Sequence, residues 1–404
     1  MTALAPLSDR VPGGRLRGAR RRVLLRRQGG TTADPHPLAH VDWFLVVIVL
    51  AISSLGLAMV YSTTNSITQV NELSRMHFVW RQALALAIGI IAMAVTAAFD
   101  YRRWRELWPL VYGIVIPLLV IVRFVGTGQG GTTAWFDIGP LQFQPSEIAK
   151  LAIVIAVGGY CHAHRGELDA WRLAVAVTVA AVAMGLTMLQ NDLGTMLVMG
   201  GCTVAILYVS GLRLVHMIVL ALLAASVLFA LIATDSFNEY RLERLYSFVN
   251  QERVENATEA NKTEYNLQQS KDAIAHGGLL GQGYGEGELT QNGFVPEQHT
   301  DFIFTAVGEE LGFVGATSLL LMFALVAWRI WRAAMVSQDF QGTLLCIGVL
   351  AILVFQIFEN AGMTMGIMPI TGIPLPFVSY GGSALIAYLA AIGIVINVHM
   401  RRFS

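Results

Sequence analysis

The chain has 404 residues, of which 55% are hydrophobic and only 13% are charged, and its formal net charge is zero. Soluble domains carry about 25% charged residues, so this composition excludes an ordinary soluble protein and indicates an integral membrane protein with many spans. The three cysteines, Cys161, Cys202 and Cys346, show neither CxxC spacing nor histidines at ligand spacing, so we interpret them as packing residues. We expect no metal centre built from them and no nucleic-acid partner.

The first 40 residues are rich in Arg, Gly and Pro and have no apolar period, which predicts a disordered cytoplasmic tail over residues 1–40. Its run Arg20-Arg21-Arg22 is typical of the positive-inside signal, and binding to anionic lipid head groups is the alternative. The first long apolar run starts near Asp42, too late and too long for a cleavable signal peptide, so we expect it to be retained.

Apolar segments then follow one another along the chain, each close to the roughly 20 residues that cross a bilayer. They predict an all-α membrane protein with about ten transmembrane helices. The expected ranges are 42–63, 77–98, 107–124, 145–163, 172–190, 193–211, 214–234, 301–328, 341–362 and 383–400.

Arginines follow every even-numbered segment, which predicts that both termini are cytoplasmic. Three polar loops then lie outside the cell membrane, with a long extracytoplasmic loop between the seventh and eighth spans. Within it, two stretches are helix-like and could be ordered on the membrane surface. The outer loops cover 126–144, 235–300 and 363–382, and the helix-like stretches cover 239–252 and 262–276.

Glu147 and Lys150 stand three residues apart at the start of the fourth predicted span, after Pro145. This spacing places both side chains on one helix face, close enough to pair. Ionisable groups inside a membrane are costly, so a function is the default hypothesis. The two interpretations are a structural ion pair that ties helices together and a cation aimed at an anionic substrate group.

Two further polar positions lie on the predicted outer side. Trp135 could be an aromatic-belt anchor or could contact a sugar or a lipid. Asp192 stands in a polar break between two spans, where it could cap the next helix or belong to a site.

Asp301 stands where the long outer loop meets the eighth span. A carboxylate near a helix N-terminus is stabilised as the anion, so it could act as a base, and an N-cap is the alternative. The preceding stretch 277–285 is rich in glycine, but it lacks a Gly-Lys-Ser/Thr ending, so we interpret it as a flexible loop over a lipid head group. These groups alone fit either an enzyme acting on a lipid-linked polar substrate or the vestibule of a transporter.

The stretch 360–383, which contains the sequence Met368-Pro369-Ile370-Thr371-Gly372-Ile373-Pro374-Leu375-Pro376, resembles the signature of the SEDS (shape, elongation, division and sporulation) family. The segments 144–147, 192–195 and 299–304 resemble family motifs in the same order. Within the family, the chain looks like the elongation member RodA rather than the division member FtsW. The resemblance covers residues 41–404, the expected transmembrane domain.

The resemblance implies a peptidoglycan glycosyltransferase of the cytoplasmic membrane that polymerises lipid II on the outer face for cell elongation and shape. It also implies a class B penicillin-binding protein as partner, together with other elongation-complex membrane proteins. Asp301 matches the essential acidic residue of the family, and we expect it to act as general base in an inverting transfer. Expected substrate-binding residues are Trp135, Glu147, Lys150, Asp192, Arg241, Arg244, His299 and Ser379.

Charge on the departing pyrophosphate could be offset by Lys150 or by a divalent cation, Mg²⁺ or Mn²⁺, which the sequence does not locate. Two departures from the family pattern are Asn191 in place of proline and Ala134 in place of arginine. The competing hypotheses are a lipid II flippase, which predicts a polar path through the membrane, and a non-catalytic scaffold of the cell-wall synthesis complex.

Overall fold

The structure is a computed structural model and describes residues 40–64, 75–129, 132–213, 215–220, 222 and 262–403. The predicted tail up to residue 39, most of the predicted span 214–234 and the helix-like stretch 239–252 lie outside the described residues. The second helix-like stretch, 262–276, forms helix α10 as expected.

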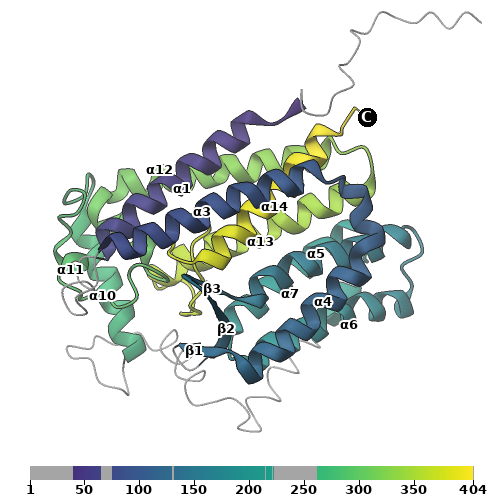
Figure 1. The fold of residues 1–404 in the computed structure, drawn as a ribbon, viewed down its shortest axis with the longest axis horizontal. Coiled ribbons are helices and arrows are strands. Elements are labelled where there is room, and N and C mark those ends of the chain that lie inside the picture. The colour runs from purple at the N-terminus through teal and green to yellow at the C-terminus, as the bar shows by residue number, and fades with distance from the viewer. Residues whose placement is uncertain are drawn as a thin grey trace, which may run out of the picture. The chain divides into compact units, whose positions relative to one another are not determined.

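The described chain consists mainly of helices (Figure 1). Eight of the described helices are long and apolar enough to cross a membrane, while α7 is shorter at 17 residues. Each predicted span except 214–234 coincides with one of these helices. The bounds of the helices are α1 Trp43–Thr63, α3 Arg75–Ala98, η2 Tyr101–Arg103, α4 Trp104–Val125, α5 Pro145–Ala163, α6 Ala170–Leu189, α7 Leu193–Val209, α10 Lys262–Gly277, α11 Glu288–Gln291, α12 Ile303–Met335, α13 Phe340–Thr364 and α14 Gly382–Met400.

Aspartates stand at the start of four described α-helices and accept a hydrogen bond from the first helical turn. A side-chain oxygen at this position satisfies a backbone N–H that has no partner within the helix. The pairs are Asp42 with Leu45, Asp169 with Arg172, Asp192 with Thr195 and Asp339 with Gly342. The predicted N-cap at Asp192 is therefore confirmed.

Helices α5, α13 and α14 form the centre of the bundle. Between 61% and 83% of their apolar windows is buried within the protein, whereas α3, α4 and α12 bury 22% or less. Helix α14 packs against α3, α13, α12 and α5, and Figure 1 shows it between α3 and α13. The helices with little burial leave apolar side chains exposed, as expected for a surface that faces lipid.

The arginines that follow the predicted spans meet at one end of the bundle. Arg102 donates to Gln338 over 2.7 Å, and Arg401 pairs with Asp100 over 3.6 Å. The guanidinium of Arg165 lies 4.2 Å from the ring centre of Phe340. These contacts join the ends of α3, α5, α14 and the α12–α13 connection, so the predicted parity of the spans agrees with the structure. The positive-inside rule assigns this end to the cytoplasm.

At the same end, the buried side chain of Asn397 on α14 closes the end of α3. Its amide nitrogen donates to the carbonyls of Thr96 (2.9 Å), Ala97 (2.8 Å) and Phe99, and its oxygen accepts from the Tyr101 amide over 3.1 Å. The last carbonyls of a helix have no partners of their own, so one side chain of α14 provides the C-terminal cap of α3.

The first outer loop forms a small antiparallel sheet that the sequence did not predict. The strands are β1 Thr127–Gln129, β2 Thr132–Ile138 and β3 Leu141–Phe143, in the order β1-β2-β3. The end of β3 is tied to α14, because the Ser383 hydroxyl donates to the Gln142 carbonyl (2.6 Å) and accepts from the Gln144 amide (2.8 Å).

Helix α12 is 33 residues long and is interrupted at Gly312, where φ is 67°. The glycine-rich stretch 277–285 is bonded into this interruption. Gln282 and Gly283 donate their amides to the carbonyls of Glu309 (3.0 Å) and Glu310 (3.1 Å), while the Phe313 and Val314 amides donate to the carbonyls of Gly278 (2.9 Å) and Leu279 (3.1 Å). We call these four hydrogen bonds the splice.

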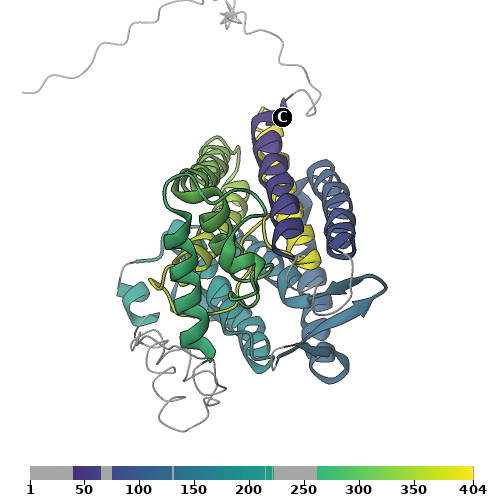
Figure 2. The same ribbon diagram turned by 90° about the vertical axis from the view of Figure 1, so that its left-hand side faces the viewer.

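The glycines of the splice allow two backbones to approach closely. A Cβ atom on Gly281 would overlap the Glu310 carbonyl, and one on Gly312 would overlap the Gly281 amide. Both residues also have positive φ, which disfavours any other residue. From the sequence, we interpreted these glycines as part of a flexible loop. That explanation is wrong, because the glycines are needed where two backbones pack closely. Helices α10 and α11, labelled in Figure 1 and seen from another side in Figure 2, lie beside the start of α12.

Candidate functional site

Asp301 lies in a tight turn that directly precedes α12. The carbonyl of Glu297 accepts from the amides of Thr300 (3.1 Å), Asp301 (3.1 Å) and Phe302 (3.2 Å), and Glu297 itself has a φ of 50°. The N-cap position of α12 is Phe302, whose side chain makes no capping hydrogen bond. The alternative interpretation of Asp301 as an N-cap is therefore wrong.

The C-terminal motif over 360–383 holds this turn by donating hydrogen bonds to the carbonyls of three successive turn residues. The Tyr380 amide donates to the carbonyl of His299 (2.9 Å), the Ser379 hydroxyl to that of Thr300 (2.5 Å), and the Asn360 amide to that of Asp301 (2.8 Å). We call Asn360, Ser379 and Tyr380 the clamp. The segments 299–304 and 360–383, which resemble the same family, thus meet in space.

The clamp is itself fixed by further hydrogen bonds. Asn360 donates a second bond to the Ile373 carbonyl (2.8 Å), and the Ser379 hydroxyl accepts from the Leu375 amide (2.8 Å). Gln82 on α3 donates to the Ser379 carbonyl over 3.0 Å. Asn360 and Gln82 are almost fully buried, so these bonds form away from water, where leaving a polar group unpaired is costly. The turn is therefore rigidly placed by α3 and α13 and the connection that follows.

An aromatic cluster of His299, Phe78 and Tyr380 packs beside the turn, with ring centres 5.5 to 5.8 Å apart. Burial lowers the pKa of His299, with Glu297 opposing the shift, so the imidazole is neutral near pH 7. Burial also raises the pKa of Tyr380, and Arg81 opposes this through its charge and a hydrogen bond. The predicted residues His299 and Ser379 thus belong to the structure that supports Asp301.

Arg81 and Asn360 are the residues that sequence reasoning missed at this site. Arg81 lies within the predicted span 77–98, and the rule that an ionisable residue inside a span indicates function would have selected it. Asn360 belongs to the motif that carried the resemblance, but nothing in its local sequence indicates that it reaches the Asp301 carbonyl.

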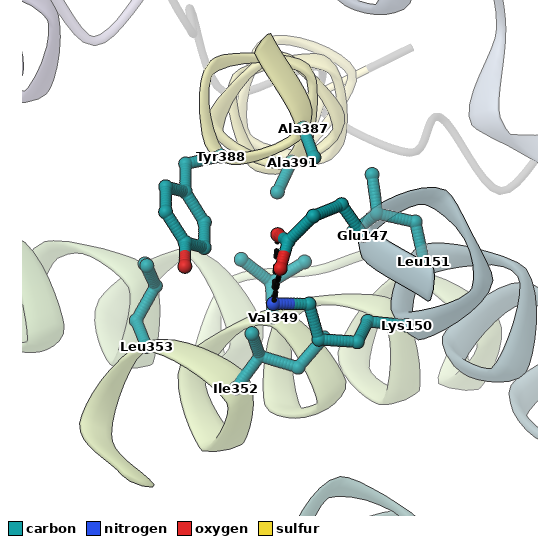
Figure 3. A pocket seen from close by; sticks show the side chains of 9 residues that line it. All are labelled: Glu147, Lys150, Leu151, Val349, Ile352, Leu353, Ala387, Tyr388 and Ala391. Carbon is teal, nitrogen blue, oxygen red and sulfur yellow. Dashed lines mark hydrogen bonds and ion pairs between the residues drawn. The ribbon is translucent and has the colours of Figure 1, made fainter. Parts of the chain in front are cut away.

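Glu147 and Lys150 lie in the packed centre of the bundle, each with 1% exposure. The Lys150 nitrogen lies 2.9 and 2.8 Å from the two carboxylate oxygens of Glu147 and 5.2 Å from the ring centre of Tyr388 on α14 (Figure 3). The pair borders a cavity of about 10 Å³, close to the space that one water needs. This geometry agrees with the ion-pair interpretation.

Asp192 joins the starts of two helices. Its Oδ1 accepts from the Thr195 amide (2.9 Å), and its Oδ2 accepts from the Gln144 side chain (3.0 Å), which directly precedes α5. Asn191, which stands where the family often has proline, has a φ of 64°, a conformation that asparagine tolerates better than most residues. The polar break is thus an ordered turn.

Trp135 lies in β2 and is half-buried, opposite Thr127 of β1. The sheet that carries it is tied to the start of α14 by Ser383, so Trp135 and the clamp belong to neighbouring segments. Arg241 and Arg244 lie outside the described residues.

Among the residues that the structure describes, no group of three His, Cys, Asp or Glu side chains is placed to hold a metal ion. The buried carboxylates of Glu309 and Glu310 are occupied by donors, including the amides of Leu289 (2.7 Å) and Gly285 (3.0 Å). Glu309 and Glu310 therefore hold backbone amides of the outer loop, and we assign no divalent cation to them.

Comparison with known proteins gives the family. The family model described as cell cycle protein, of FtsW, RodA and SpoVE, matches residues 42–403. The chain is 34% identical to stage V sporulation protein E of Bacillus subtilis, over 88% of this chain and 96% of the relative. It is 33% identical to the peptidoglycan glycosyltransferase MrdB of Escherichia coli, over 90% of this chain and 94% of the relative.

Two solved structures are similar over 90% of this chain. One, at 31% identity and a TM-score of 0.75 over 99% of that chain, comes from work on polymerization and crosslinking by a peptidoglycan synthase complex. The other is the rod shape determining protein RodA of Thermus thermophilus, at 30% identity and a TM-score of 0.66 over 98% of that chain. MrdB and RodA among the matches are consistent with the RodA-like character of the C-terminal motif. Because the family model covers the whole described bundle, the chain is a multi-pass membrane protein that belongs to the FtsW/RodA/SpoVE family.

Proposed function

We propose that this chain is a peptidoglycan glycosyltransferase that polymerises lipid II on the outer face of the cytoplasmic membrane, in cell elongation and shape. The names of the relatives and family membership support the activity. The observation that carries the catalytic assignment is the clamp, which holds the carbonyls of three successive residues ending at Asp301. Reacting groups must be placed closely for transfer, and a turn fixed this way provides that placement.

In the proposed reaction, Asp301 accepts the proton of the acceptor 4-hydroxyl as its oxygen attacks the anomeric carbon of the donor sugar. The bond from this carbon to the lipid pyrophosphate breaks, and undecaprenyl diphosphate leaves with the bonding electrons. Direct displacement converts an α-linked donor into a β-linked chain. The start of α12 lies directly after Asp301, and its dipole favours the carboxylate form that the reaction needs.

Negative charge on the leaving pyrophosphate requires a cation or hydrogen-bond donors. Arg81 lies against Tyr380 of the clamp, so it is better placed for this role than Lys150, which pairs with Glu147 in the core. Arginine also binds phosphate oxygens through two parallel hydrogen bonds. We propose Arg81 as a phosphate contact and keep Arg241 and Arg244 as predicted ones.

We further propose that the chain works with a class B penicillin-binding protein, as the similar synthase complex supports, and with other elongation-complex membrane proteins. The packed centre around Lys150, with space for about one water, supports a polymerase over a flippase, which needs a polar path.

The test is glycan-strand formation from purified lipid II with the intact protein and its penicillin-binding partner. Asp301→Asn should lower the rate by about 10²–10⁴-fold, the usual contribution of a general base. Glu288→Gln, an exposed carboxylate on α11, is the matched control and should remain active. Polymer from Asp301→Asn at the normal rate would remove Asp301 as base, and no polymer from the intact, partner-bound protein would favour the flippase or scaffold.

A further inference from the structure

The glycine-rich stretch 277–285 carries two leucines that point away from the protein. Leu279 is 72% exposed and Leu280 is 81% exposed, the latter among the most exposed large apolar side chains of the described residues. Across the splice, Phe313 (64%) and Val314 (52%) of α12 are exposed too. An exposed cluster of large apolar side chains normally marks a contact with a membrane or another protein.

The depth of this cluster follows from the contacts between α1 and α12. At the cytoplasmic end, Arg329 donates to Asp42 over 2.8 Å, and at the other end Ser62 donates to Glu310 over 2.5 Å. Helix α1 between these contacts has 21 residues, about 30 Å at 1.5 Å per residue, which matches the hydrocarbon thickness of a bilayer. The level of Glu310 is therefore the outer boundary of the hydrocarbon.

The splice lies on the hydrocarbon side of that boundary. Its lower bonds are made by the amides of Phe313 and Val314, which follow Glu310 towards the cytoplasmic end of α12. The part of α12 that precedes Glu310 therefore extends beyond the hydrocarbon together with the Asp301 turn.

Irregular backbone is tolerated at this depth only if its polar groups are satisfied within the protein. The splice meets that condition, because the loop and the interrupted helix exchange the donors and acceptors that each would otherwise leave exposed. The amide of Gly281 adds a bond to the Gly277 carbonyl over 2.8 Å. The backbone is thus bonded inward while both leucine side chains face outward.

We propose that the stretch 277–285 is a membrane anchor whose residues Leu279 and Leu280 insert into the hydrocarbon of the outer leaflet. Transfer of an exposed leucine side chain from water to hydrocarbon is favourable, so the pair provides an attachment to the membrane. Because the anchor is bonded to α12 at residues 309, 310, 313 and 314, close after Asp301 in the chain, it holds the Asp301 turn at a constant height above the lipid.

The test places an environment-sensitive fluorophore on single cysteines in the intact protein in lipid vesicles. The natural cysteines are buried and stay unlabelled under mild conditions. Leu280→Cys is the test position, Asn292→Cys is the water control in the exposed outer segment, and Leu321→Cys, exposed in the middle of α12, is the hydrocarbon control. Quenching by iodide in water is compared with quenching by lipids that carry a nitroxide high or low on the acyl chain.

A label at Leu280→Cys should resist iodide several-fold better than one at Asn292→Cys, and lipids with a shallow nitroxide should quench it best. The Leu321→Cys label should respond best to the deep nitroxide. Iodide quenching equal to that of Asn292→Cys, with no quenching by lipid, would overturn the proposal. Protection that arises only when the penicillin-binding partner is added, without lipid quenching, would also overturn it and would assign the leucines to a protein interface.

Discussion

The turn around Asp301 and the core around Glu147 hold their carboxylates by different means. Both oxygens of Glu147 lie within 2.9 Å of Lys150, and the pair is 1% exposed. The Asp301 turn is half-buried and is held by bonds to the backbone carbonyls of residues 299–301. A carboxylate neutralised in the core contributes to the fold, whereas a turn fixed through its main chain can present a side chain to a substrate.

Separation of the buried ion pair between Glu147 and Lys150 should have the largest effect on stability. Lys150→Met leaves the Glu147 carboxylate unpaired in an apolar core, which should destabilise the protein by about 3–5 kcal/mol. The double variant Glu147→Gln with Lys150→Met removes both charges and should recover most of this stability. The measurement is the midpoint of thermal unfolding in detergent for each single variant and for the pair.

The same double variant separates structure from catalysis. If the ion pair is structural, the folded double variant should polymerise lipid II at a rate close to that of the unsubstituted protein. A double variant that folds well but forms no polymer would contradict this and return Lys150 to the substrate site.

The clamp gives the next largest effect. Asn360→Ala removes the bond to the Asp301 carbonyl, and a misplacement of about 1 Å can lower a rate by as much as 10²-fold, so kcat should fall by about 10–100-fold while KM changes little. Gln356→Leu is the matched control, because it lies one turn away on α13 and its 2.7 Å bond goes to Tyr388 instead. Equal loss of kcat in both variants would show that general loosening of α13, and not the clamp, is responsible.

Substitution of Asp192 should have a smaller effect, on the stability of the protein. Asp192→Ala removes the cap of α7 and should cost about 1 kcal/mol of stability. Asp192→Asn keeps a good capping residue and should keep both the unfolding midpoint and the polymerisation rate. An asparagine variant with normal stability but no activity would give Asp192 a role in the site beyond capping.

The smallest expected effect is a pH dependence that arises at His299. Burial lowers its pKa in the folded protein, so the folded state binds fewer protons than the unfolded state below about pH 6.5. The contribution of His299 to the free energy of unfolding should therefore be fully present above that pH. It should be lost as the pH falls through the pKa of His299 in the folded protein. Unfolding midpoints across this range should decline less in His299→Gln, and identical profiles would assign the acid sensitivity to other groups.

The sequence predicted the spans within the described residues well, because each depends on a local property, the run of apolar residues. The cap at Asp192 and the pairing of Glu147 with Lys150 were equally predictable, since both follow from spacing of three residues within one helix. Asp301 was identified by its junction and by the family resemblance, although its alternative as a helix cap proved wrong.

What the sequence did not predict depends on contacts between distant segments. Asn360 reaches the Asp301 carbonyl from α13, and Gln82 reaches Ser379 from α3, and no local period indicates either contact. The sheet over 127–143 has short strands with little alternation. We interpreted the glycines near 281 as a sign of mobility, since the sequence alone does not reveal that a second backbone packs against them.

The cap that Asn397 places on α3 has a consequence for biosynthesis. Helix α14 follows all other described helices in the chain, yet it is the most deeply buried of the candidate spans and closes the carbonyls at the end of α3. Synthesis proceeds at about 5–20 residues per second, so the earlier spans wait many seconds without their central helix. The carbonyls at the end of α3 therefore receive their polar cap only as α14 enters the bundle.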